Sequence, residues 1–374
     1  MDTPAFANSL LDPVPQPERT DTPPIECANA GPGLLLSSPT LPRFVSGTAA
    51  YQGQRKDMQD ECVAFDDVKK AFPWYVGGPA SFYGVYDGHG RTASAAAFCR
   101  DVLHVHLLTR LSDIMTVGEH PYMHAGYVAQ MLEEAFLQTD AEYARLGRSD
   151  GSAVGVALVR GDKLWVATAG DVGVIGPATL QQLPTGRASE SLYAPHKHRR
   201  FYKAPDPVIP SGWHAPQPSA DCQLLMVPHR PEVQEEVARV VRCGGGMYAG
   251  RVNGKLAITR AVGDRDLKSP MRRDAGPLAF QPRDEIVTAE PSVTAFALTR
   301  DADFLVLASD GLLDFCPQEH IASVVRARRA EGWTPQRVAH YLAQEVLSPP
   351  PLSPVATSPD NVTCVVVYIE WPQA

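Results

Sequence analysis

Short apolar runs that end at turn residues set the pattern of this chain. Residues 82–86 read Phe-Tyr-Gly-Val-Tyr, which is typical of a β-strand, and the Asp-Gly-His-Gly that follows predicts the end of that strand. Residues 153–159 and 163–169 are apolar runs on either side of a Gly-Asp turn and predict a β-hairpin. Residues 304–309 and 362–369 are further strand-like runs. These runs predict a core built on β-sheet.

Helical sequence lies between the strands. Ala-rich residues 92–108 favour a helix, and residues 127–146 place apolar side chains near one helical face. Residues 231–242 predict a helix that ends at three glycines, and residues 318–329 predict another. A last helix is expected at 334–347, because a threonine there can cap it and a proline takes its first position. Two long helices in succession fit a helical layer over a sheet.

Composition divides the chain into three regions. Residues 1–42 are rich in Pro, Ser and Thr without periodicity, so we expect a disordered tail. Residues 43–370 hold the predicted strands and helices and form the expected domain. Pro, Ser and basic residues fill about 176–221, and we interpret this segment as a surface insertion because it offers little to bury. Its basic cluster at 196–200 is typical of a solvated loop; nuclear targeting and binding of a phosphorylated partner are the alternatives.

Charge and cysteine content narrow the class of protein. A net charge of −8 disfavours nucleic acid or an anionic membrane as the main partner. The seven cysteines include no C-x-x-C pair, which favours reduced thiols in the cytoplasm or nucleus. The N-terminus lacks a secretory signal pattern, and no apolar run reaches membrane-spanning length. We therefore expect a monomer of the cytoplasm or nucleus that binds neither nucleic acid nor membranes.

Three aspartates stand at the ends of predicted strands. Asp87 and Asp310 are each followed by Gly, and Asp360 is followed by Asn. If the strands are neighbours, these carboxylates meet at one sheet edge, where they would repel one another. Hard divalent cations bound through oxygen would relieve that repulsion, so the pattern indicates Mg²⁺ or Mn²⁺ chemistry. A plain tight turn is the alternative that turn chemistry alone favours for Asp87 and Gly88.

A series of short motifs carries a family resemblance. In chain order the motifs are Arg55–Asp60, Val85–Gly90, Asp150–Ala153, Ala169–Asp171, Arg251–Asp264, Ala308–Gly311 and Asp360-Asn361. Their order and approximate spacing resemble those of the metal-dependent serine/threonine protein phosphatases of the PPM (2C) type. The resemblance runs from about residue 43 to 369, apart from the insertion. It implies an α+β fold, a four-layer α-β-β-α sandwich with two central antiparallel sheets and a two-metal centre between them.

The resemblance also implies how the metals are held. Asp87 would bridge two ions, Mg²⁺ or Mn²⁺, and the carbonyl of Gly88 would bind one of them. Asp310 and Asp360 would hold the other ion, with Asp60 in a supporting position.

Further residues acquire roles from the same resemblance. A third, more weakly held ion would lie at Asp171 and Asp314. Arg55 would grip the substrate phosphate through its guanidinium fork. His89 would protonate the departing serine or threonine oxygen; without the flanking motif, it would be interpreted as a turn histidine bonded to backbone. A water or hydroxide bridging the metals would attack phosphorus in line, and the implied substrates are phosphorylated proteins.

The chain departs from the family pattern at several positions. Gln59 stands where the family usually has a Glu that supports the second metal. Val172-Gly173 replaces a usual Ser-Arg, and Pro-His-Arg-Pro at 228–231 replaces an Asp-His-Lys-Pro run. Loss of an outer partner commonly costs about 10- to 100-fold in metal affinity or activity. We therefore expect an active phosphatase with loosened affinity for the second metal.

Two alternatives to this function stay open. A pseudophosphatase would use the same fold to bind phosphoproteins or to scaffold a partner without turnover. Gln59 and the insertion favour it, whereas the motif aspartates, Arg55 and His89 oppose it. The second alternative is a metal-dependent hydrolase of another phosphate ester, which the metal-site residues alone do not distinguish.

Overall fold

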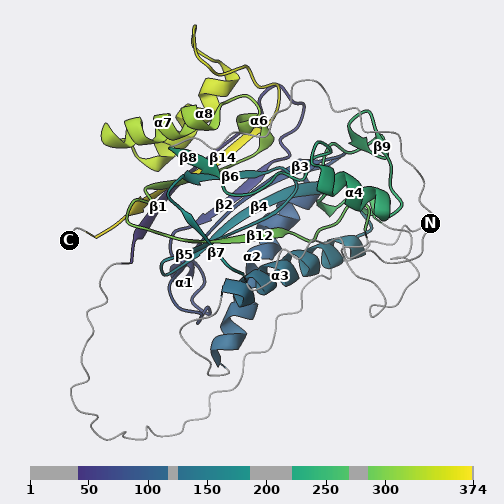
Figure 1. Cartoon of the computed structure of the whole chain (residues 1–374), viewed down its shortest axis with the longest axis horizontal. Coiled ribbons are helices and arrows are strands. Elements are labelled where there is room, and N and C mark those ends of the chain that lie inside the picture. Colours follow the sequence, from purple (N-terminus) through teal and green to yellow (C-terminus); the bar gives the residue numbers. More distant parts are fainter. Residues whose placement is uncertain (1–40, 117–124, 186–220, 269–284, 373–374) are drawn as a thin grey trace, which may run out of the picture. The chain divides into compact units, whose positions relative to one another are not determined.

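Two sheets packed face to face, with helices on both outer sides, make up the computed structural model (Figure 1). It describes residues 41–116, 125–185, 221–268 and 285–372. The described part of the predicted domain lies in one compact unit. The predicted tail lies outside the described residues, except for its last two.

The first sheet, called here the β13 sheet, carries both ends of the described chain. Its strands, in spatial order, are β1 (Arg43–Tyr51), β14 (Val362–Glu370), β13 (Phe304–Ala308), β6 (Gly173–Pro177) and β8 (Cys222–Leu224). Each neighbouring pair is antiparallel. The sheet therefore brings the N-terminal strand of the domain beside the C-terminal one.

The second sheet, called the β3 sheet, contains the strand that carries Asp87. In spatial order it is β2 (Glu61–Phe65), β3 (Ala80–His89), β4 (Gly151–Arg160), β5 (Lys163–Ala169), β12 (Ser292–Ala297) and β7 (Gln181–Leu183), with β11 (Val262–Gly263) also paired to β4. All of these pairs are antiparallel, including the predicted β4–β5 hairpin.

Two pairs of helices form the outer layers. Helices α2 (Ser94–Thr116) and α3 (Ala125–Arg145) cover the β3 sheet, and α7 (Gln318–Ala330) and α8 (Pro335–Leu347) cover the β13 sheet (Figure 1). The predicted cap of α8 is confirmed, because the Thr334 hydroxyl accepts a hydrogen bond from the backbone N–H of residue 337. The α-β-β-α order predicted from the sequence is therefore confirmed.

Smaller elements complete the described chain. They are α1 (Val68–Ala71), α4 (Gln234–Arg242), β9 (Met247–Tyr248), β10 (Arg251–Val252), the 3-10 helix η1 (Arg265–Leu267) and α6 (Asp310–Leu313). The expected helix at 231–242 thus begins three residues later, at Gln234. No helix among the described residues has both the length and the apolar character needed to cross a bilayer.

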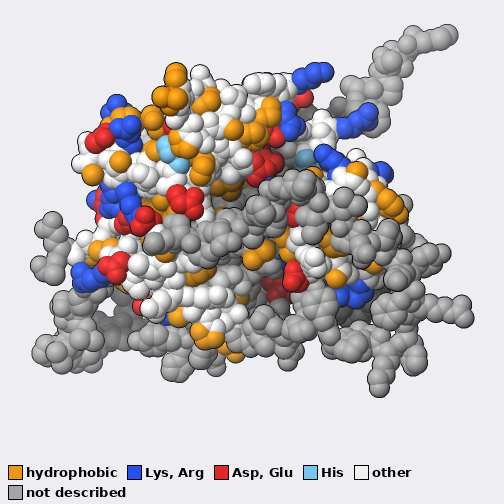
Figure 2. Space-filling view, turned by 45° about the horizontal axis from the view of Figure 1, so that its top comes forward, with side chains coloured by type: hydrophobic (Ala, Val, Ile, Leu, Met, Phe, Trp, Pro, Cys, Tyr) orange, Lys and Arg blue, Asp and Glu red, His pale blue; other side chains and the backbone are white. Residues whose placement is uncertain are grey.

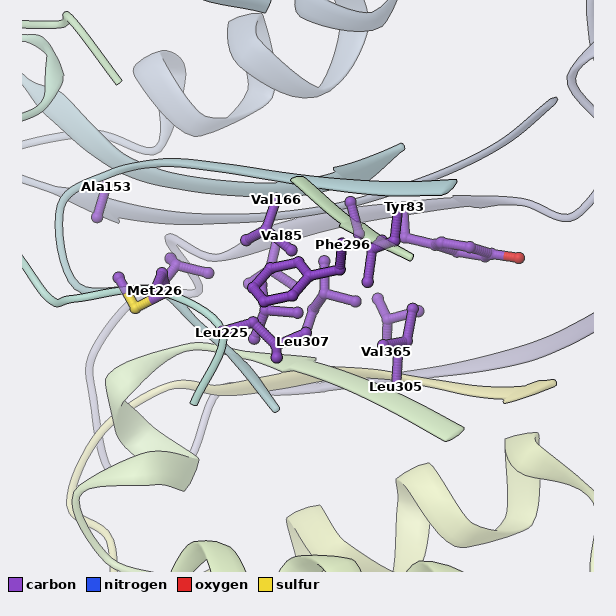
Figure 3. Close-up of a cluster of buried hydrophobic side chains, with 14 of the residues drawn as sticks. Tyr83, Val85, Ala153, Val166, Leu225, Met226, Phe296, Leu305, Leu307 and Val365 are labelled. Atoms are coloured by element: carbon purple, nitrogen blue, oxygen red, sulfur yellow. The ribbon is translucent and has the colours of Figure 1, made fainter. Parts of the chain in front are cut away.

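On the face of the described chain seen in Figure 2, hydrophobic side chains lie among charged ones, and Lys and Arg lie close to Asp and Glu. In the interior, side chains alternate along the strands, which divides the apolar ones between three layers. Inside, Tyr83 and Val85 of β3 face Leu305 and Leu307 of β13, and they meet between the sheets (Figure 3). Intervening residues on the same strands, such as Phe82, pack against helices instead. Burial of both faces explains why these strands are nearly continuous apolar runs.

Two sequence predictions about strand limits were wrong. The strand beginning near 82 does not end at Asp87, because β4 offers it partners as far as His89, which pairs with Gly151. The turn starts instead at Gly90, whose φ of +103° favours glycine. The expected insertion also begins too early, since β6 runs through Pro177 and β7 follows at 181–183. Residues 186–220 of that segment lie outside the described residues.

Candidate active site

Asp310 and Asp360 meet at one end of the β13 sheet. Strands β13 and β14 are antiparallel neighbours, and the N–H of Ser309 extends their pairing by donating to the Thr363 carbonyl at 3.0 Å. Asp310 lies two residues after β13, and Asp360 lies two residues before β14. The two carboxylates predicted to converge from these strands therefore do so.

Asp87 reaches the same region from the other sheet. It lies within β3, opposite Ala153 of β4, and the charges of Asp60, Asp310 and Asp171 act on its carboxylate. The expectation that all three strand-end aspartates share one sheet edge was thus wrong for Asp87. The site lies where the two sheets face each other, because residues on β3 contact both β13 and β14.

Two glycines allow the close approach of backbone that this arrangement needs. A Cβ at Gly88 would lie 2.3 Å from the Gln59 carbonyl oxygen, and one at Gly311 would lie 1.8 Å from the Asn361 carbonyl oxygen. Either contact is too short for any side chain. The Gly after each aspartate in Asp87-Gly88 and Asp310-Gly311 is therefore required by packing against a neighbouring segment of the site.

The side chain of Asn361 holds in place the loop that carries Arg55, the residue expected to bind the substrate phosphate. Its Nδ2 donates to the carbonyl oxygens of Gln52 at 2.7 Å and Asp57 at 3.1 Å. Its Oδ1 accepts from the N–H of Gln59 at 2.8 Å. These bonds hold residues 52–59 against the start of β14, so Arg55 and Gln59 lie beside Asp360. Asn361 lies in one of the family motifs, but that motif alone predicts no role for it.

The carboxylates grouped around Asp87 favour a cation. Burial, followed by the charge of Asp360, raises the pKa of Asp60 to about 6, although the Ser309 hydroxyl opposes the shift. Burial and the neighbouring carboxylates raise the pKa of Asp310 to about 7 and that of Asp87 well above its ordinary value. Asp60 is only 4% exposed, and its Oδ2 has no hydrogen-bond partner among the described residues. This donor set fits divalent cations bound through oxygen.

Arginines pair with several of these carboxylates. Asp360 forms an ion pair with Arg55, whose side chain is 56% exposed. Arg230 contacts Asp171 and Asp314, at 2.8 Å and 2.9 Å. Among the described residues, no three His, Cys, Asp or Glu side chains lie close enough together to hold a metal ion as they stand. Because Arg55 pairs with Oδ2 of Asp360, metal binding at Asp360 would compete with this ion pair.

His89 has a carboxylate partner that sequence analysis missed. Its Nε2 lies 2.7 Å from Oδ2 of Asp264, which is only 6% exposed. Burial alone would lower the pKa of His89, but the charge and hydrogen bond of Asp264 outweigh burial and raise it. Asp264 has a positive φ of 51°, and its N–H donates to the Asp150 carbonyl at 3.1 Å. Asp264 lies in one of the family motifs, and this motif was the signal in the sequence that could have identified it.

Gln59, the departure from the family Glu, lies at the edge of the site. Its Nε2 donates to the carbonyl oxygen of Gly90 at 3.3 Å. The side chain thus lies near the turn after His89 but brings no charge to it.

A scan against family models supplies the deciding comparison. The model described as protein phosphatase 2C matches residues 45–175 and 217–349, which is more than half of the chain. The chain belongs to the protein phosphatase 2C family. The match omits residues 176–216, most of the expected insertion, and stops before Asp360. The PPM (2C) resemblance drawn from the motifs is confirmed. Members of this family are in general metal-dependent and act on phosphoproteins.

Relatives and solved structures agree with membership of the protein phosphatase 2C family. Probable protein phosphatase 2C 2 of Oryza sativa subsp. japonica is 29% identical over 352 residues, covering 91% of this chain and 77% of the relative. Probable protein phosphatase 2C 27 of Arabidopsis thaliana is 27% identical, covering 87% and 69%. The crystal structure of serine-threonine phosphatase 2C from Toxoplasma gondii has a TM-score of 0.61 at 18% identity, covering 89% of this chain and 99% of that one. This structural likeness shows the fold.

Proposed function

We propose that this chain is a protein serine/threonine phosphatase that hydrolyses phosphoserine and phosphothreonine with the help of divalent metal ions. The observation that carries the proposal is that the carboxylates of Asp60 and Asp310 both act on the carboxylate of Asp87, and that the pKa values of all three are raised. The guanidinium of Arg55 and the imidazole of His89 lie at the same site. Hydrolysis of a phosphate ester requires charge stabilisation on the phosphoryl oxygens and an acid for the leaving oxygen, and these groups can supply both.

The carboxylates would hold two ions, Mg²⁺ or Mn²⁺. Asp87 and the Gly88 carbonyl lie on β3, and Asp310 and Asp360 lie at the end of the β13 sheet, so ligands reach the site from two sides. Asp60 would support them from the start of β2. When bound, the ions supply Lewis-acid charge that activates water and neutralises the phosphoryl oxygens.

Arg55 and His89 would act on the substrate directly. Arg55 extends from a half-exposed position beside Asp360 and would bind the phosphate with its planar fork. His89 donates its Nε2–H to Asp264 when protonated, so the proton for the leaving oxygen would come from Nδ1. Asp264 would keep the ring in this orientation and would favour its charged form.

The pseudophosphatase alternative would require a site that lacks groups needed for catalysis. Gln59 removes one charge, but the buried carboxylates, Arg55 and the His89–Asp264 pair are all present. This combination favours an active enzyme over a pseudophosphatase.

Assays on the purified full chain test the proposal. A phosphothreonine peptide should be hydrolysed with millimolar Mn²⁺ but not with EDTA, and Asp310→Asn should remove the activity. Absence of turnover at millimolar Mn²⁺ in the folded wild-type protein would overturn the enzyme and favour the pseudophosphatase. Hydrolysis of small phosphate esters without any turnover of phosphopeptides would point to a different phosphate ester as substrate.

Partners and location follow as further parts of the proposal. The mixture of basic and acidic side chains seen in Figure 2 and the net charge of −8 support phosphorylated proteins, not nucleic acid or membranes, as the main partners. We expect a monomer in the cytoplasm or nucleus. Sedimentation of the purified protein and fractionation of cells test these two expectations.

A further inference from the structure

Arg230 occupies the space between the two aspartates expected to bind a third metal. Its Nε donates to Oδ2 of Asp171 at 2.8 Å, and its Nη1 lies 2.9 Å from Oδ1 of Asp314. The side chain of Arg230 is 18% exposed and that of Asp171 is 9% exposed, whereas Asp314 is 43% exposed. One guanidinium thus bridges a largely buried carboxylate and a more open one.

The backbone immediately before Arg230 is fixed to the interior. The N–H of His229 donates to the Gly170 carbonyl at 2.9 Å, immediately before Asp171, and its Nε2 contacts the Ser292 hydroxyl at 2.8 Å. The carbonyl of His229 accepts from the N–H of Thr259 at 2.8 Å. His229 is only 3% exposed. The buried residue His229 therefore holds Arg230 in position against Asp171.

This geometry is poorly suited to a third ion. A cation bound by both Asp171 and Asp314 would have to displace a guanidinium that already pairs with both carboxylates. Arginine keeps its charge at every accessible pH, so deprotonation would not clear the site. Leaving the largely buried positive charge of Arg230 without a partner would be costly.

We propose that Arg230 takes the place of a third metal ion, so that this chain binds two divalent ions. The fixed guanidinium neutralises Asp171 and Asp314 and also lowers the pKa of the nearby Asp310 carboxylate, which burial raises. The inference rests on the proposed metal-dependent function, but it concerns the number of ions and not the reaction. It replaces the expectation that Asp171 and Asp314 are ligands.

Counting bound Mn²⁺ on the full-length protein tests the proposal without any activity assay. Free Mn²⁺ is measured by its electron paramagnetic resonance signal while the ion is titrated, and calorimetry gives the affinities. Wild-type protein should bind two ions, and Asp314→Asn should bind the same two with unchanged affinity. A third ion in the wild type that is lost in Asp314→Asn would overturn the proposal.

Variants of Arg230 supply the complementary test. Arg230→Met removes the charge at similar length and should gain one additional ion, which the double variant with Asp171→Asn should lose again. An Arg230→Met protein that melts as a folded domain but binds no additional ion would overturn the proposal. Wild-type protein that neither binds Mn²⁺ nor hydrolyses phosphopeptide would instead overturn the proposed phosphatase, while the gain of an ion in Arg230→Met would still support the role of Arg230.

Discussion

His89 and Asp264 are joined by a 2.7 Å contact between Nε2 and Oδ2, although 175 residues separate them along the chain. Asp264 lies directly after β11, which pairs with the first two residues of β4, and His89 ends β3, which pairs with the same two residues. The two side chains thus meet across the end of β4. Because the contact is built into the sheet, it fixes the ring of His89 before substrate binds.

Asp264→Asn should impair hydrolysis of a phosphothreonine peptide far more than hydrolysis of p-nitrophenyl phosphate. An alkoxide leaving oxygen needs a proton, whereas p-nitrophenolate leaves without one. General acid catalysis contributes about 10²- to 10⁴-fold, so a loss of about 10- to 100-fold in kcat on the peptide is expected. Steady-state kinetics on both substrates measures the difference.

His89→Asn should show the same selective loss, and Asp266→Asn serves as the control. Asp266 is an exposed aspartate two residues beyond Asp264, so its variant removes the same charge without touching His89. Equal losses on both substrates in Asp264→Asn would mean that Asp264 supports the fold and does not position an acid.

Gln59→Glu should strengthen metal binding. The Gln59 amide contacts the Gly90 carbonyl at the edge of the site, and a carboxylate there would add negative charge near the ions. We expect the Mn²⁺ concentration for half-maximal activity to fall by about 10-fold, within the range typical of outer partners. Gln54→Glu adds the same charge to an exposed position of the same loop and should change little. An unchanged Mn²⁺ requirement in Gln59→Glu would show that the missing charge does not weaken the site.

Arg55→Ala should separate phosphate binding from metal binding. Losing the guanidinium should raise KM for the phosphopeptide and weaken inhibition by inorganic phosphate. Removing the ion pair should also free Asp360, so Mn²⁺ affinity measured by calorimetry should rise about two- to five-fold, the amount expected for a partly exposed pair. Lys56→Ala removes the same charge from the next residue and is the matched control. Unchanged Mn²⁺ affinity in Arg55→Ala would mean that the ion pair does not compete with metal.

Local signals explain why so much of the fold could be predicted from the sequence. Strands β13 and β14 are buried on both faces, so they are continuous apolar runs that can be recognised without knowing their neighbours. Helix α8 carries its own cap. Strand β12 was missed because Ser-Val-Thr-Ala-Phe-Ala has a mixed pattern. Strands β7 and β8 have only three residues each, which is too few for a periodicity to stand out.

Only those residues of the candidate site that lie at the ends of recognisable strands could be placed from the sequence. Asp310 and Asp360 lie at the ends of recognisable strands, and their meeting follows from antiparallel pairing. Which sheet supplies Asp87, and which residue faces His89, depends on tertiary packing that has no local signature. The contact between Arg230 and Asp171 likewise joins residues 59 positions apart. Family motifs identified the segments, but only the fold shows the partners.

A buried ion-pair network ties α4 to the segment that leads to Asp264. The carboxylate of Glu236 accepts hydrogen bonds from Arg260 at 2.6 Å and from Arg239 at 2.9 Å, and its side chain is 6% exposed. Burial alone would raise the pKa of Glu236, but the charges of both arginines outweigh burial and hold it well below its ordinary value. The ionised carboxylate therefore stabilises the folded state.

Glu236→Gln should destabilise the protein at pH 7 by about 3 to 5 kcal/mol, because it leaves two largely buried guanidinium groups without their shared partner. A lowered pKa in the folded state contributes stability that is complete above the ordinary glutamate pKa of about 4.3 and is lost as the pH falls towards the folded value. The difference in the free energy of unfolding between wild type and Glu236→Gln, measured with urea on metal-free protein, should therefore be constant from about pH 7 to pH 5. Below about pH 4.3 it should shrink by about 1.4 kcal/mol per pH unit. Glu235→Gln, at the exposed neighbouring position of α4, should stay within about 0.5 kcal/mol of wild type at pH 7. A difference for Glu236→Gln that does not change with pH would show that lost packing, and not the buried charge, accounts for the destabilisation.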